Sequence, residues 1–377
     1  MVTVSTGELA VVGMGMAAPG VCGPADALAP AGAAAPGWFE AEVALPGRGY
    51  RRLPDACKYL LAASRLAVGD AGGRFARTER EHRGAAVAIN NTGAALLEAM
   101  DRTIMREGAA QMSPSSSPFI AMSSFASRLS MEHDITGFNL TVNSPVTAGL
   151  EALQIAARAV AAGRARAVLV GAVEEALSPS QALPPAPGTP WQPPATGAPW
   201  QPPSPGAPSR APASVPPSQA FAPGTEAGAA VLHCEPAAGG HARYGTCRVR
   251  SAFLAPGAAT HDAHAVLGPL VGDAPPGRVD AVLDDSAVGT AAARWLDHLH
   301  GACEVVVVPA PAQAGCLTPL RRVVGLFAQA HTAPTRRAVL TASAQGTLAY
   351  AELTVAPRGG SSPGPRAPRA AAAKGGE

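Results

Sequence analysis

Charged and aromatic residues are scarce in this chain, and their scarcity narrows the classes of protein to which it can belong. Charged residues make up 15% of its 377 positions and aromatic residues only 4%. Lysine occurs only at Lys58 and Lys374, so arginine carries nearly all of the positive charge. The formal net charge is +2, which is too small to indicate a nucleic-acid partner.

Long apolar runs and paired cysteines are also missing. No apolar run approaches the roughly 20 residues that span a bilayer, and the N-terminus lacks the basic region of a signal peptide. We therefore expect a cytoplasmic chain without membrane contact. The cysteines are scattered and form no CxxC pair, which predicts neither a disulfide framework nor a zinc site. They are Cys22, Cys57, Cys234, Cys247, Cys303 and Cys316.

Residues 137–175 are the most informative stretch that is present. Their pattern predicts a strand, a tight turn, a buried helix, a short loop and a second strand. The turn Asn143-Ser144-Pro145-Val146 places one side chain at the start of the helix. Many enzymes keep a nucleophile at such a point, because a helix N-terminus favours an anion. Here the position holds Val146, which offers no reactive atom.

Strands and helices alternate through both ordered parts of the chain, which predicts an α/β fold with largely buried sheets. Each part is long enough to supply one sheet with covering helices. Besides residues 137–175, we expect strands at 8–14, 84–90, 229–234, 244–254, 279–283, 304–308, 338–343 and 348–355, and helices at 51–69, 94–107, 117–133, 261–270, 288–300 and 315–331.

A segment rich in Pro, Ala, Gly and Ser separates the two ordered parts. Its composition cannot build a packed core, so residues 179–224 are expected to be a disordered insertion and residues 358–377 a disordered tail. The ordered parts are then residues 1–178 and 225–357. Trp191 and Trp200 could form a docking motif, but a low-complexity linker is the simpler interpretation.

Several motifs, taken in their order and spacing, resemble those of the β-ketoacyl synthases. AVVGMGMAAPG is similar to that family's opening strand and turn, and LPDACKYLLAASRLAVGDAG to its first long helix. The stretch 138–149 resembles its nucleophile strand and elbow, and EAGAAVLHCE the strand that opens its second half. The resemblance implies the thiolase-like fold, in which two related halves form a layered α-β-α-β-α architecture.

The resemblance also implies where the catalytic groups would stand. The family uses a Cys nucleophile, two His residues that bind a thioester oxygen, and a Lys. These positions fall on Val146 for the Cys, Asp285 and Cys316 for the two His residues, and Pro311 for the Lys. The family's Gly-rich, Phe-gated loop is reduced to residues 345–347. Every chemical group is absent at once, so we predict no catalytic residue in this chain.

The leading hypothesis is therefore a catalytically degenerate ketosynthase-like subunit in polyketide or fatty-acid-type biosynthesis. The resemblance implies a chain-length factor that forms a heterodimer with a Cys-containing ketosynthase and meets acyl carrier protein through that complex. The family's factors commonly carry Gln where this chain has Val146. Dimerisation is expected through residues 138–142, and residues 117–133 are similar to a helix that lines the family's interface pocket.

Two other hypotheses stay open. The chain could be an active acyltransferase or condensing enzyme with a relocated nucleophile at Cys316 or Ser144, although Ser144 and Thr147 are expected to cap a helix and close the turn. It could instead be an interaction scaffold that works through the Pro/Trp-rich insertion. Neither a metal nor a cofactor is expected. GMGMAAPG lacks the third glycine and the following acidic residue of a dinucleotide-binding loop. The pairs His261/His264 and His298/His300 lack supporting carboxylate or Cys ligands.

Overall fold

The computed structural model describes residues 7–30, 37–114, 117–177, 226–239, 242–272, 274–310 and 315–358. The predicted insertion with Trp191 and Trp200, the tail beyond Arg358 and the position Pro311 lie outside these residues. The domain boundaries proposed near residues 178 and 225 also fall outside them and stay predictions.

The described strands form one mixed sheet of ten strands, in the order β3-β2-β4-β5-β1-β6-β10-β9-β7-β8. They are β1 (Leu9–Ala17), β2 (Arg83–Ile89), β3 (Asn139–Asn143), β4 (Ala167–Glu174), β5 (Gly228–Pro236), β6 (Gly245–Phe253), β7 (Arg278–Leu283), β8 (Glu304–Pro309), β9 (Thr335–Ala342) and β10 (Thr347–Val355). All of the strands expected from the sequence are present.

The two halves of this sheet repeat one topology. In the first half β2 pairs in parallel with β3 and β4, and β5 runs antiparallel to β4 and β1. In the second half β7 pairs in parallel with β8 and β9, and β10 runs antiparallel to β9 and β6. The halves join through a short β1–β6 pairing, from Leu9↔Cys247 to Val11↔Gly245. The prediction of two related halves is confirmed, although they share one continuous sheet rather than two separate ones.

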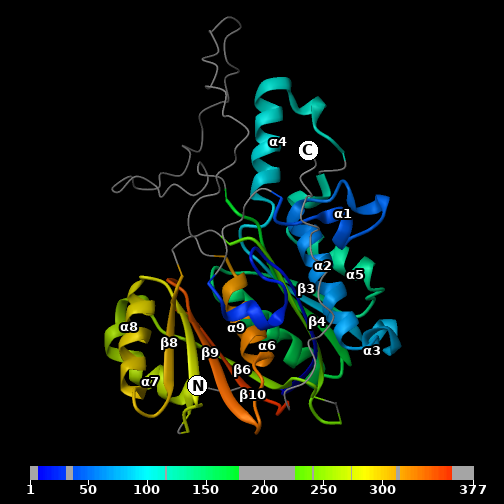
Figure 1. Ribbon diagram of the computed structural model, residues 1–377. Helices are drawn as coiled ribbons and strands as arrows, with labels where there is room; N and C mark the ends of the chain where they lie inside the picture. The colour runs from blue at the N-terminus through cyan, green and yellow to red at the C-terminus, as the bar shows by residue number, and fades with distance from the viewer. Residues whose placement is uncertain are drawn as a thin grey trace, which may run out of the picture.

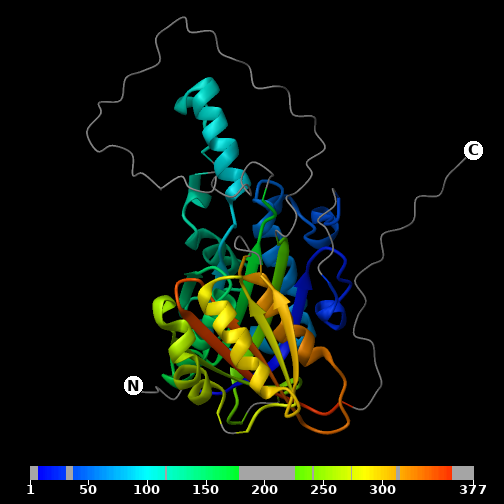
Figure 2. The same ribbon diagram turned by 90° about the vertical axis from the view of Figure 1, so that its left-hand side faces the viewer.

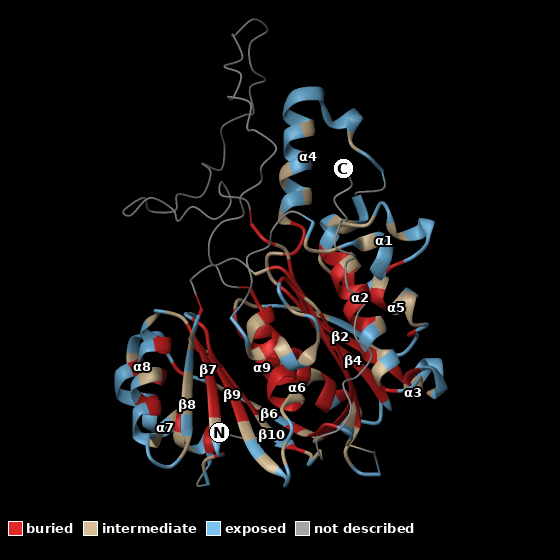
Figure 3. Ribbon diagram, in the orientation of Figure 1, coloured by how far each residue is buried: buried red, intermediate tan, exposed pale blue. Residues whose placement is uncertain are grey.

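The helices complete five layers. Helices α6 (Ala148–Ala161) and α9 (Leu317–Ala328) lie in the middle and pack on strands of both halves. Helices α2 (Asp55–Asp70) and α5 (Ser123–Glu132) cover the outer face of the first half, and α7 (Ala259–Val271) and α8 (Ala287–Leu296) that of the second (Figure 1). The burial pattern follows these layers, since the middle helices and inner strands are the most deeply buried elements (Figure 3).

Small residues let the outer helix α2 approach the sheet closely. A Cβ atom at Gly13 would lie 2.2 Å from the carbonyl oxygen of Ala67, and one at Gly15 would lie 2.1 Å from that of Ala63. Both contacts are far shorter than a carbon and an oxygen allow, so β1 needs glycine at these two positions. The abundance of Gly and Ala in the sequence is thus used for close packing between β1 and α2.

Several predicted helix boundaries are wrong by a turn. Helix α2 begins at Asp55 rather than at residue 51, because Pro54 stands at its N-cap. The segment predicted as a helix over 117–133 is split into the 3₁₀ helix η5 (Ser117–Ile120) and α5. Helix α8 ends at Leu296, where the 3₁₀ helix η7 (Asp297–Leu299) follows.

Helix α4 (Ala94–Glu107) extends away from the body of the molecule (Figure 2). Within the part of the chain that the structure describes, no helix is both long enough and apolar enough to cross a bilayer.

Candidate functional site

The elbow between β3 and α6 has the strained backbone that a nucleophile position commonly has. Val146 adopts φ 61°, a left-handed conformation that is unusual for a β-branched residue. The backbone N–H of Thr147 donates to the carbonyl oxygen of Pro145 at 2.6 Å, and that of Ala148 donates to Ser144 at 3.3 Å. Such strain is of order 1–3 kcal/mol and persists only where the surroundings enforce it. The tight turn predicted from the sequence is therefore present with valine at its centre.

Apolar side chains surround Val146. It is buried, with 3% of its surface exposed, and it packs with Val282 of β7, Ala310 and the partly buried Val308 of β8. The four side chains are aliphatic, so this cluster contains neither a nucleophile nor a proton acceptor. The carboxyl ends of β3, β7 and β8 meet here, and their side chains fill the space with hydrocarbon.

The acidic loop after β7 directs one of its two carboxylates to a helix start. Asp284 accepts a hydrogen bond at Oδ1 from the backbone N–H of Ser286, at 3.1 Å, and Ser286 Oγ accepts from the N–H of Gly289 as the N-cap of α8. Asp285, the position predicted for the first family His, is exposed. Its assignment to that family position stays a prediction.

Cys316 stands at the N-cap of α9, facing the first turn of α6. It is fully buried, and its backbone N–H donates to Oε1 of Glu174 at 2.7 Å. A Cβ atom at Gly149 would lie 2.8 Å from the Cys316 carbonyl oxygen, so the N-termini of the two middle helices touch. Burial, together with the Glu174 carboxyl, raises the pKa of the Cys316 thiol well above its usual range, and the thiol stays protonated.

Two glutamates that no local sequence motif identifies hold the start of α9. Glu174 is fully buried at the end of β4 and accepts hydrogen bonds from the N–H groups of Cys316 and Asn91, both at 2.7 Å. Glu226 accepts from the N–H groups of Leu317 and Thr318, at 2.9 and 3.0 Å. The helix N-terminus attracts both carboxylates, but burial opposes their charge. Burial first, and then Glu226, raise the pKa of Glu174 to about 8.

The raised pKa of Glu174 predicts a pH dependence of stability. The ordinary pKa of this carboxyl is 4.5, so from about pH 4.5 to about pH 8 the unfolded chain loses a proton that the folded chain keeps. Stability therefore falls as pH rises through this window, by up to about 1.4 kcal/mol per pH unit from this group. Glu174→Gln is expected to flatten that slope.

Urea unfolding at half-unit steps from pH 5 to pH 9 measures this slope, which is informative even if Gln lowers stability at every pH. Glu151→Gln serves as the control and should leave the slope unchanged. An identical slope in Glu174→Gln and the native chain would contradict the role of Glu174.

The hydroxyl groups of Ser144 and Thr147 were predicted to cap α6, but they do not. Ser144 Oγ donates to Oε2 of Glu151 at 3.2 Å, and Thr147 Oγ1 donates to its Oε1 at 2.8 Å. Thr147 is the N-cap residue, but its side chain makes no hydrogen bond to a backbone N–H of the helix. The carboxylate of Glu151 lies one turn into α6 and takes both hydroxyls instead. Within the described part of the chain, neither hydroxyl bonds to a histidine that could activate it.

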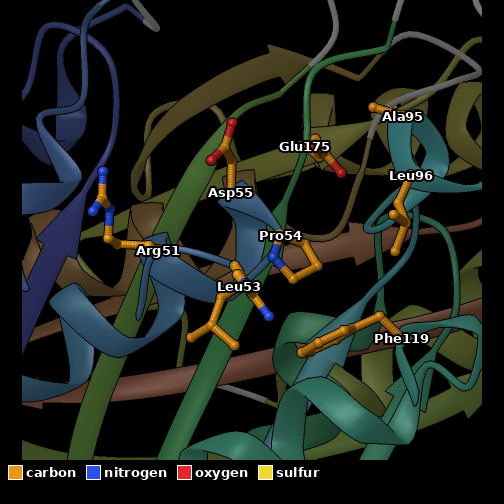
Figure 4. A pocket seen from close by; sticks show the side chains of 9 residues that line it. Arg51, Leu53, Pro54, Asp55, Ala95, Leu96, Phe119 and Glu175 are labelled. Carbon is orange, nitrogen blue, oxygen red and sulfur yellow. The ribbon is translucent and has the colours of Figure 1, made fainter. Parts of the chain in front are cut away.

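A cavity of about 310 Å³ opens between the start of α2, the first turn of α4 and η5. Leu53, Leu96 and Phe119 supply apolar walls, and Glu175 contributes a carboxyl group (Figure 4). Glu175 accepts a hydrogen bond from the N–H of Gly93 at 3.0 Å, and burial raises its pKa to about 7. The sequence signal for this cavity is weak, because its lining comes from four separate segments.

Arginines gather beside this cavity. Arg48, Arg51 and Arg52 with Gly49 line an adjoining hollow, and all three arginines are exposed. Three neighbouring guanidinium groups exposed to solvent attract acidic partners through their summed electrostatic field.

Histidine pairs do not assemble into a larger ligand set. The rings of His264 and His298 meet edge to face at 4.6 Å, while His300 lies 3.4 Å from Asp297. Within the described ranges, the one group of three potential ligands is Glu79, Glu81 and His82, whose ligand atoms lie within 4.8 Å of one another on an exposed turn. Exposed acidic groups of this kind are common in the absence of a metal.

A short turn joins β9 and β10. The backbone N–H of Gly346 donates to Ser343, and the N–H of Ser343 donates to the carbonyl oxygen of Thr347, both at 2.9 Å. The strands pair from Leu348↔Ala342 onward, so the turn is closed. The residues 345–347 predicted to be the remnant of a Gly-rich gate are thus part of a tight turn.

Several apolar side chains of the first half are exposed. Strand β3 is the edge strand of the sheet there, and Leu140 at its centre is 43% exposed. Other exposed apolar residues of the first half are Val43, Leu66 of α2, Leu97, Ile104 and Met105 of α4, Ile120 of η5 and Met131 of α5. Helix α5 contacts both β3 and η5, so we call Leu140, Ile120 and Met131 the β3 face. A monomer rarely leaves such a surface uncovered beside an open strand edge.

Part of this chain is similar in sequence to known proteins. Residues 39–183 match the family described as "Beta-ketoacyl synthase, N-terminal domain". Among curated proteins, the chain is 28% identical over 129 residues to 3-oxoacyl-[acyl-carrier-protein] synthase 2 of Vibrio harveyi, covering 34% of this chain and 31% of the relative. It is 26% identical over 141 residues to the enzyme of that name from Vibrio cholerae serotype O1, covering 37% and 34%. The chain thus matches about a third of the length of these relatives.

Solved structures resemble nearly the whole chain. The ishigamide ketosynthase/chain length factor has a TM-score of 0.63 at 20% identity and covers 93% of this chain and 100% of its own. The type II PKS acyl-carrier protein in complex with its ketosynthase, AntDE:AntF, has a TM-score of 0.60 at 14% identity, with coverage of 92% and 99%. The chain therefore has the thiolase-like fold of ketosynthases, as predicted. The match to the β-ketoacyl synthase N-terminal domain covers residues 39–183, which is less than half of the chain.

Proposed function

We propose that this chain is a non-catalytic ketosynthase-like subunit of the chain-length-factor type. The observation that carries the proposal is Val146, which occupies the strained elbow and packs against Val282, Val308 and Ala310. A nucleophile at this point would need an accessible, polarised site, whereas this one is filled with aliphatic side chains. Asp285 and Cys316 supply no imidazole to bind a thioester oxygen.

The partner in this proposal is a Cys-containing ketosynthase that covers the β3 face. The face combines an open strand edge with three exposed apolar side chains, which suits a subunit interface. One structural relative is a ketosynthase/chain length factor, and this supports the pairing by analogy. In the resulting heterodimer this chain would complete the partner's active site and limit the length of its product.

Acyl carrier protein is the second proposed partner, reached through the heterodimer. The exposed guanidinium groups of Arg48, Arg51 and Arg52 lie beside the cavity lined by Phe119 and Glu175, and they suit an acidic protein. The second structural relative is itself a complex of such a carrier with a ketosynthase.

Co-expression with a Cys-containing ketosynthase, followed by size-exclusion chromatography, tests the proposal. We expect a stable complex of the two chains that elongates carrier-bound substrates, while the ketosynthase alone gives shorter or fewer products. If this chain elutes as a monodisperse monomer whether or not the ketosynthase is present, the proposal is wrong.

A relocated nucleophile is the alternative, and its candidates are Cys316 and Ser144. The thiol of Cys316 is fully buried and kept protonated, and Ser144 donates to a carboxylate that no histidine accompanies. Both observations weigh against the alternative. We expect no mass increase when the purified chain is incubated with an acyl carrier thioester. A covalent adduct that disappears in Cys316→Ala or Ser144→Ala would establish the alternative instead.

A further inference from the structure

Two histidines, the buried His233 and the partly buried His133, lie against the short helix α3 (Arg74–Arg77), which is remote from the elbow in the sequence. The ring of Phe75 from this helix meets His233 of β5 at 5.2 Å and His133, the C-cap of α5, at 6.0 Å, edge to face in both cases. Phe75 is 1% exposed and His233 is fully buried. The anchoring of α3 therefore depends on the space between two imidazole rings.

Among the residues that the structure describes, neither ring nitrogen of His233 has a hydrogen-bond partner. Its Nε2 atom lies 3.6 Å from Oε1 of Glu235, a carboxylate that Arg74 of α3 already holds through two hydrogen bonds at 3.0 and 2.6 Å. An unpartnered buried imidazole is costly, and a charged one costs more. Once protonated, His233 would attract Glu235 away from Arg74.

His133 ties the same helix to its neighbours. Its Nε2 atom is 2.7 Å from Ser64 Oγ of α2, and its carbonyl oxygen accepts from Arg83 of β2 at 3.0 Å. Arg83 also donates to the carbonyl oxygens of Ala76 and Thr78, at 2.8 Å each, and thereby links the end of α3 to the end of α5. The same cationic side chain would face a protonated His133.

We propose that residues 72–78 form an acid-sensitive latch, which protonation of His233 and His133 releases while the rest of the fold persists. The charged groups that face His233 are Glu235, Arg74 and His133. Those that face His133 are Glu132, Asp134, Arg65 and Arg83. Helix α3 has four residues, so few other contacts hold it in place.

Proton binding by the two histidines favours opening of the latch at low pH. Burial, above all, lowers the pKa of both His133 and His233 to about 4 from an ordinary 6.5. An opened latch exposes both rings and lets them bind protons below about pH 6.5, whereas the closed latch keeps them neutral. Acidification from pH 7.5 to pH 5 should therefore favour the open form by roughly tenfold or more for each histidine.

Hydrogen–deuterium exchange between pH 7.5 and pH 5, corrected for the intrinsic rate, tests the latch. We expect protection of residues 72–78 to fall at least tenfold over this range while residues 317–328 of α9 stay protected. His233→Met and His133→Gln should each reduce the fall, and His82→Gln, a nearby half-buried histidine, should leave it unchanged.

Three results would overturn the proposal: protection of residues 72–78 that does not change with pH, a fall that is the same in both histidine variants as in the native chain, or loss of protection in α9 at the same pH. If a variant does not fold, NMR titration of the native histidines replaces it. Two imidazoles that titrate between about pH 4 and pH 6.5 in step with α3 resonances support the latch, and independent titrations refute it.

Discussion

Asp280→Ala is expected to lower the free energy of unfolding by about 3–5 kcal/mol, which would make it one of the most damaging single substitutions in the second half. Asp280 lies on β7 and is fully buried. Its Oδ1 accepts from Arg278 Nε and its Oδ2 from Arg322 Nε, both at 2.6 Å. Removal of the carboxylate leaves the guanidinium of Arg322, which is 8% exposed, without its counterion inside the middle layer.

Guanidinium chloride unfolding of the native chain and the variant measures this loss. Glu304→Ala is the matched control, because Glu304 binds the same Arg278 at 3.1 Å from the exposed side of the edge strand β8. An exposed pair contributes about 0–1 kcal/mol, so the control should lose little stability. Equal losses in the two variants would show that the burial of Asp280 has no special effect.

Leu140→Asp is expected to weaken association with the ketosynthase partner at least about a hundredfold. If the β3 face is the interface, the new carboxylate would be buried there without a counterion, at a cost of several kcal/mol, and each 1.4 kcal/mol is a tenfold change. The fold of this chain should tolerate the change, because Leu140 is 43% exposed in the monomer. This prediction depends on the proposed function.

Val307→Asp provides the control for the interface. Val307 is 50% exposed on β8, the edge strand of the second half, which occupies the position that β3 has in the first half. Dissociation constants from analytical ultracentrifugation should change only for Leu140→Asp. If Val307→Asp weakens the complex more than Leu140→Asp, the interface lies at the other end of the sheet.

The alternation of strands and helices could be predicted from the sequence, because each element has its own local pattern of residues. The runs of small apolar residues at 8–14 and 84–90 identified two buried strands, and the elbow sequence at 143–146 identified its turn. Helix ends were less accurate, since Pro54 and the 3₁₀ segments at 117–120 and 297–299 depend on how the chain packs after the helix. The periodicity used to find helices does not report those local departures.

The candidate site was readable only in part. Val146, Asp285 and Cys316 were proposed from the order and spacing of motifs along the chain, and their assignment to the family positions stays a prediction. Glu174 and Glu226 were missed, although both bind the N-terminus of α9, because 52 positions separate them in the chain and no local pattern joins them. The cavity beside Glu175 was missed for the same reason.

The sequence by itself determined the α/β class, the family resemblance and the chemically empty elbow, because these follow from residue type and order along the chain. Only the tertiary structure decided that the two halves share one sheet, that Val146 packs against Val282 and Ala310, and that Cys316 is buried against Glu174. Burial and long-range contacts set the pKa of Glu174 and the proton on Cys316, and they arise only when distant segments are brought together.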